Sequence, residues 1–181
     1  IISAGYEVTQ VEIAQNIFAI GVGGGISLGL LYAISGVGSG LGPIAARGFT
    51  RDRIQTLRRA IIFGYLIAAL GLGIIATLHS FPVVLLGGLF RRVGGGIVWV
   101  FSTQLLLQLV PTRVRGRVFS FEQAGFALSS AVAAATSGVI LDLTADVSQL
   151  LSGLALLALF PCLLWTLWST FRPVDETFRA D

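Results

Sequence analysis

Long apolar runs constrain this chain more than any other feature of its sequence. A helix needs about 20 apolar residues to cross a membrane, because it rises ~1.5 Å per residue. Five runs have this length: Ile26–Ala46, Ala60–Leu78, Val83–Leu109, Val118–Leu141 and Leu150–Thr170. A shorter run, Val8–Ile20, carries Glu12 and Asn16, and we interpret it as part of a sixth helix whose start is missing or irregular. The sequence predicts an all-α integral membrane protein with six transmembrane helical segments.

The composition excludes an ordinary soluble domain. Only 12% of the 181 residues are charged, whereas a soluble domain carries about 25%. The single cysteine, Cys162, cannot form a disulfide or a metal cluster within one copy of the chain, and we expect no cofactor. The chain begins with Ile1 and shows no signal peptide, so we expect it to be a piece of a longer protein.

The arginines predict how the chain is oriented in the membrane. Five lie in the loop Arg47–Arg59, three in Val110–Arg117 and two in the tail Phe171–Asp181, whereas the connectors between the other helix ends have none. Basic loops stay in the cytoplasm, so we expect these loops and the C-terminus to be cytoplasmic, in a cell (inner) membrane. Because the arginines fall between apolar runs, the basic charge indicates a membrane topology and no nucleic-acid partner.

Enzymatic chemistry has little support in the sequence. The one histidine, His79, lies in a short outward connector, away from any serine at membrane depth. The chain has no lysine, and therefore no nucleotide-binding loop of the Walker type. We expect no catalytic residue and no enzyme activity.

Two stretches resemble a known transporter family. Gly29–Pro43 (GLLYAISGVGSGLGP), followed by a basic loop, resembles the eighth helix of major facilitator exporters. Gly94–Gln104 (GGGIVWVFSTQ) and Val110–Ser120 (VPTRVRGRVFS) resemble their tenth helix and the loop into the eleventh. The nearest likeness is to the bacterial exporter branch that includes enterobactin-exporter-like proteins. The resemblance covers nearly the whole chain, as helices seven to twelve, and implies the C-terminal six-helix half of a twelve-helix transporter.

The family's cytoplasmic loop motif is partly present. Within Gly42–Arg51 (GPIAARGFTR), Gly42, Arg47 and Arg51 match the pattern Gly-x-x-x-Asp-Arg-x-Gly-Arg-Arg/Lys. Ala46 stands in place of the acidic residue and Phe49 in place of the second glycine. The departure puts a charge-relay role of this loop in doubt.

Arg91 and Arg92 are the strongest candidates for a functional site. In a helix centred on Gly96 they lie roughly 6–8 Å from the bilayer midplane, where an arginine costs about 2.5–3.5 kcal/mol on insertion scales. One interpretation is that one of them faces the transport pathway and binds an anionic group of the substrate, or a carboxylate such as Glu12. The other is that both extend toward the outer interface as anchors.

Further polar residues in the apolar runs have two interpretations each. Glu122 is either a proton site or a first-turn residue beside a capping box of Ser120 and Gln123, close enough to pair with Arg117. Thr9, Glu12 and Asn16 share a face at helical spacing, which lines the pathway or packs against the missing half. The side chains after Arg92 either bind substrate or hydrogen-bond across helices: Trp99, Ser102, Gln104 and Gln108.

These observations predict a secondary active transporter. The resemblance implies alternating access, with ion-gradient-driven efflux of a small-molecule substrate. The expected partners are the lipid bilayer, the substrate and the missing N-terminal half. The alternative is a non-transporting membrane scaffold that associates through glycine-rich helix faces.

Overall fold

The structure is a computed structural model that describes residues 2–50, 54–144 and 146–171, and its regular structure is helical throughout. The α-helices are α1 (Ile2–Glu12), α2 (Gly25–Thr50), α3 (Ile54–Ala76), α4 (Phe81–Leu109), α5 (Arg115–Thr144) and α6 (Val147–Phe171). A π-helical turn, Ile13–Ile17, continues α1, and short 3₁₀ turns cover Val22–Gly24 and Thr112–Val114.

Five helical segments of the described chain are long and apolar enough to span a membrane, and they correspond to α2 through α6. The expected count of six spans is not confirmed, because α1 has only 11 residues and does not run through to Ile20. The chain leaves helical geometry at Phe18, where φ is −124°. The Ser27 hydroxyl then donates to the Phe18 carbonyl and accepts a bond from the Ile20 amide, which holds this segment in a turn.

The basic loops are shorter than the sequence predicts. Helix α2 continues to Thr50 and α3 begins at Ile54, so most of Arg47–Arg59 is helical. Similarly, α5 already begins at Arg115. Helices can include charged residues where they leave the membrane because water solvates these ends, so the end of an apolar run does not mark the end of a helix. Pro82 lies in the first turn of α4, where its missing N–H costs no helical hydrogen bond.

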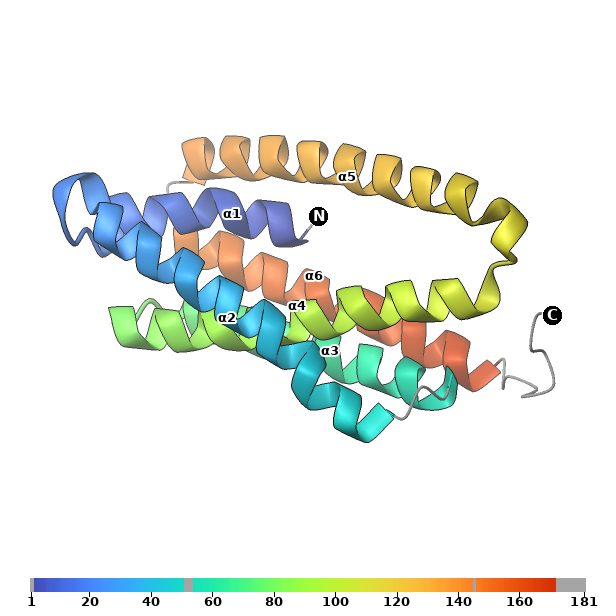
Figure 1. The fold of residues 1–181 in the computed structure, drawn as a ribbon. Helices are drawn as coiled ribbons and strands as arrows, with labels where there is room; N and C mark the ends of the chain where they lie inside the picture. Colours follow the sequence, from blue (N-terminus) through green and yellow to red (C-terminus); the bar gives the residue numbers. More distant parts are fainter. Residues whose placement is uncertain (1, 51–53, 145, 172–181) are drawn as a thin grey trace.

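The helices form an extended bundle in which α3 packs between α4 and α6 (Figure 1). Helix α2 packs on the other side of α4, and α1 packs against both α6 and α5. Figure 1 shows α5 running along α1, at the edge of the bundle. Since α5 packs mainly on α1, it buries only Ala133 and Ser137 among its 30 residues.

Glycines set how closely α4 approaches its neighbours. A Cβ atom added to Gly38 of α2 would lie 2.8 Å from Cβ of Arg92 and 2.9 Å from the Leu89 carbonyl oxygen. Gly94 of α4 sits more tightly still against the backbone of α3 at Gly64 and Ala68. Small residues allow such close helix contacts in lipid. Among the glycines of α2, Gly38 and Gly42 contact α4, whereas Gly36 and Gly40 face open space.

Aromatic side chains join the first turns of α3 to the last turns of α6. Trp165 donates its indole N–H to the Arg58 carbonyl oxygen at 3.2 Å. The Arg58 guanidinium lies 4.3 Å from the centre of the Trp168 ring. These two tryptophans therefore hold α6 against α3.

Candidate functional site

Arg91 is buried in the interior of the bundle. It lies four residues before Gly95, the middle residue of α4, and therefore about 6 Å along the helix from its centre. Its exposed fraction is 5%, and its guanidinium carbon lies 3.8 Å from the centre of the Tyr6 ring. Tyr6 is fully buried on α1. A cation over an aromatic face contributes about 2 kcal/mol or more when both are desolvated, so this contact compensates part of the cost of burying the charge.

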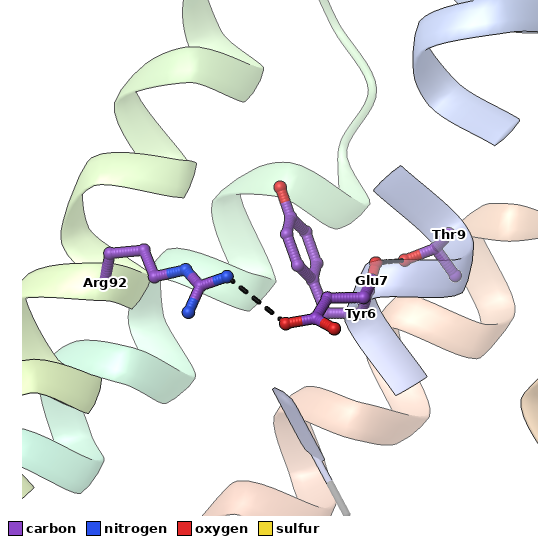
Figure 2. Close-up of polar contacts among 4 residues, drawn as sticks. All are labelled: Tyr6, Glu7, Thr9 and Arg92. Carbon is purple, nitrogen blue, oxygen red and sulfur yellow. Dashed lines mark hydrogen bonds and ion pairs between the residues drawn. The ribbon is translucent and has the colours of Figure 1, made fainter. Parts of the chain in front are cut away.

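Arg92 also reaches α1, through an ion pair. Its terminal nitrogen Nη2 lies 3.4 Å from Oε1 of Glu7, and Figure 2 shows Arg92 extending from α4 toward this carboxylate with the Tyr6 ring beside it. The Arg92 side chain is 24% exposed and that of Glu7 is 52% exposed. The two adjacent arginines therefore contact consecutive residues of α1. We call Tyr6, Glu7, Arg91 and Arg92 the α1–α4 polar centre.

Several buried polar atoms in and beside this centre lack a hydrogen-bond partner among the described residues. They are the Tyr6 hydroxyl, Nε and Nη2 of Arg91, Nε of Arg92, and both amide atoms of Gln10, one helical turn after Tyr6. A buried donor without an acceptor costs about 1–3 kcal/mol, and more when it is charged. The centre therefore has unused capacity to bind a group with acceptor oxygens.

A groove of about 580 Å³ lies beside the centre, between α1 and α5. Two acidic side chains of α1, Glu7 and Glu12, line it together with Asp142 of α5, and the rest of its wall is mainly small or aliphatic. Glu7 thus belongs to both features: its carboxylate pairs with Arg92 and also lines the groove.

The stripe predicted on the first helix does not form one surface. Thr9 is fully buried and donates to the Tyr6 carbonyl oxygen at 2.7 Å. Glu12 lines the groove, and Asn16 is exposed in the π-helical turn. The π-helical turn shifts the residues after Glu12 relative to a regular α-helical register, so sequence spacing alone misplaces Asn16.

The capping box predicted beside Glu122 is wrong. Because α5 begins at Arg115, Ser120 is inside the helix and its hydroxyl donates to the Gly116 carbonyl at 2.8 Å. In the described part of the chain, no ion pair joins Glu122 to Arg117. Glu122 is half-buried. It lies several helical turns before Ala134, the first α5 residue that lines the groove.

The other predicted site residues lie apart from the polar centre. Trp99 is 46% exposed and its ring meets Phe126 of α5 edge-on, with 5.4 Å between the ring centres. Ser102 donates to the Trp99 carbonyl, and Gln104 and Gln108 are half-buried with partners of their own.

The loop motif is split between buried and exposed positions. Gly42 is buried against the Val93 backbone of α4, so its role in the structure is helix packing. Arg47 is exposed in the last turn of α2. Arg51 lies outside the described residues.

Sequence reasoning missed Tyr6, Glu7 and Gln10. The apolar run of the sequence begins at Val8, so apolar character alone does not indicate the helical turns before it. One local signal was available. The spacing of Tyr6 and Gln10 places both on one side of a helix, and the carboxylate Glu7 directly follows Tyr6. The contacts of Tyr6 with Arg91 and of Glu7 with Arg92 join positions 85 residues apart and have no local signature.

One protein-family model matches most of the chain. Residues 9–180 match the model described as Major Facilitator Superfamily. The chain belongs to the major facilitator superfamily. Membership makes it a secondary transporter, and its five candidate spans make it a multi-pass membrane protein in contact with the lipid bilayer. No match was found among curated proteins or among solved structures.

Proposed function

We propose that this major facilitator chain is one half of an exporter that moves a small molecule out of the cell, driven by an ion gradient. The α1–α4 polar centre lies in its transport pathway. We place it in the bacterial exporter branch, in the inner membrane, with the C-terminus in the cytoplasm.

The observation that carries the proposal is the engagement of two arginines near the middle of α4 with α1. Anchoring at the outer interface would let both side chains extend toward water. Instead Arg91 is 5% exposed over Tyr6, and Arg92 pairs with Glu7. Ionisable residues at membrane depth face a bundle interior or a water-filled path, since lipid would penalise them. Their position supports a role in transport over a role in anchoring.

The role as one half is supported by the surface of α5. This helix exposes large apolar side chains along its length, among them Phe121, Leu128 and Leu143 with exposed fractions of 81%, 69% and 80%. A surface of this kind suits lipid or a second helical bundle. In alternating access, two bundles rock around a site between them, and the groove beside α5 would then border that site.

The other residues predicted to line the pathway would lie at different points along it. Glu12 lines the groove beside the centre. Trp99, Ser102 and Gln104 follow Arg92 along α4 toward its cytoplasmic end, where they would line the inner part of the path. Asn16 and Glu122 would border the path at its two ends.

Efflux from cells tests the proposal. Cells that express the full-length protein are loaded with a panel of fluorescent or radiolabelled small molecules, and retention is compared with that of cells carrying an empty vector. We expect at least one compound to be retained less, and this difference to disappear when an ionophore collapses the ion gradients. Equal retention of every compound, or efflux that survives the ionophore, would contradict gradient-driven export.

A further inference from the structure

The α1–α4 polar centre carries more positive than negative charge. It holds two guanidinium groups, and Glu7 is the one carboxylate that pairs with either of them within the described ranges. Arginine stays protonated when it is buried, so an excess of one positive charge remains. An uncompensated charge in a low-dielectric interior is costly. The centre would be stabilised by one more negative group.

The unpartnered donors point to the same kind of ligand. Arg91 offers Nε and Nη2, and Arg92 offers Nε, all buried and without an acceptor in the described structure. The planar guanidinium fork matches two oxygens held at fixed spacing, as in a carboxylate. A group with one negative charge and two acceptor oxygens would therefore satisfy charge and hydrogen bonding together.

Glu7 is the partner that can be displaced. Its contact with Arg92 measures 3.4 Å, which is longer than the ~2.7–2.9 Å of a strong charge-assisted hydrogen bond. The Glu7 side chain is half exposed and already lines the groove between α1 and α5. When it leaves Arg92, it can remain solvated in that groove, so its release does not bury a second unpaired charge.

We propose that the transported compound carries an anionic group, of the carboxylate type, which replaces Glu7 on Arg92. Substrate and Glu7 compete for the same guanidinium, while Arg91, held over Tyr6, supplies a second fixed positive charge. This inference rests on the proposed transport function and adds the chemical class of the substrate. Competition also links the groove to the centre, because each substrate that binds frees the Glu7 carboxylate.

Two probes of the same shape and opposite charge test the inference. Equilibrium binding of radiolabelled benzoate and of benzylamine, which is cationic at neutral pH, is measured on the full-length protein in lipid nanodiscs. The variants are Glu7→Gln, Arg92→Gln and the control Asp142→Asn. Asp142 lines the same groove as Glu7 and forms no ion pair in the described structure, so it reports any general effect of removing an acidic charge. Thermal unfolding of each variant identifies those that do not fold.

The expected sign separates competition from a structural role of Glu7. Benzoate should bind the wild type in preference to benzylamine. Glu7→Gln should tighten benzoate binding about fivefold or more, the lower range of coupling between linked sites. Asp142→Asn should leave it unchanged, and Arg92→Gln should abolish it. The inference is overturned if Glu7→Gln weakens benzoate binding or leaves it unchanged. An equal gain in Asp142→Asn, preference for benzylamine, or no benzoate binding to any variant would also overturn it.

The efflux assay distinguishes failure of this inference from failure of the proposed function. If only neutral or cationic compounds are exported in a gradient-dependent way, transport stands and the anionic class is wrong. If nothing is exported, the proposed function itself fails.

Discussion

Arg91 of α4 lies over the face of Tyr6 of α1, with 3.8 Å between the guanidinium carbon and the ring centre. Both residues are buried, and they belong to helices that the chain connects through α2 and α3. The contact therefore fixes the side of α4 that faces α1. It also orients the neighbouring Arg92 toward Glu7, since the next residue of a helix points about 100° away.

The aromatic ring of Tyr6 should matter more than its hydroxyl. Replacing Tyr6 with Phe keeps the ring under Arg91, so we expect stability and transport near those of the wild type. Replacing it with Leu removes the cation–π contact and leaves a buried charge, at a cost of about 2 kcal/mol or more. Thermal unfolding of the purified variants measures the difference. If Phe is as destabilising as Leu, the ring does not stabilise Arg91.

Gly94 and its neighbour Gly95 provide a matched pair for helix packing. A Cβ atom at Gly94 would collide with the α3 backbone at Gly64 and Ala68, whereas one at Gly95 meets nothing within 4 Å. We expect Gly94→Ala to destabilise the protein by about 1–3 kcal/mol, as overpacking does. Gly95→Ala should be neutral or stabilising by up to about 1 kcal/mol, because alanine favours helix.

Unfolding in detergent with a stepwise denaturant measures both glycine variants. Equal effects of the two substitutions would show that the close approach of α3 and α4 is not required for stability.

Membrane orientation can be tested at the two ends of α3. Gln55, in its first turn, and His79, just after its end, are both exposed. Single cysteines at these positions, in a background where the buried Cys162 is replaced by serine, should react on opposite sides of the membrane. From outside intact cells, a membrane-impermeant thiol reagent should label position 79 and leave position 55 unlabelled. Labelling of position 55 alone would reverse the proposed topology.

The long apolar runs predicted the spanning helices because their signal is local. Twenty apolar residues in a row need no partner to indicate a span, and the structure has a helix over each of the five runs. The helix ends were predicted less well, since water at the membrane surface tolerates Arg47 and Arg115 inside helices. The length of the first helix was predicted less accurately. Glu12 and Asn16 show that the segment is polar, but the sequence does not show the π-helical turn in which the helix ends.

Part of the polar centre was predictable and part was not. The depth of Arg91 and Arg92 follows from their position in an apolar run, and it identified them as candidates. Their partners could not be predicted, because the contact of Arg92 with Glu7 depends on how α1 packs in the bundle. Glu12, the carboxylate that sequence spacing suggested, lies in the adjoining groove instead.

Transport by lysine variants tests most directly whether the arginines of α4 belong to the transport pathway. Lysine keeps a positive charge near the membrane surface, but it lacks the planar fork of arginine and loses its proton more readily when buried. The full-length protein with Arg91→Lys or Arg92→Lys is compared with the wild type for gradient-dependent efflux of a compound found in the panel assay, at matched levels in the membrane. We predict that Arg92→Lys, the more accessible of the two positions, loses at least about tenfold in rate, or about 1.4 kcal/mol, with normal expression. Wild-type rates in both single variants would show that the arginines are anchors and would contradict the account.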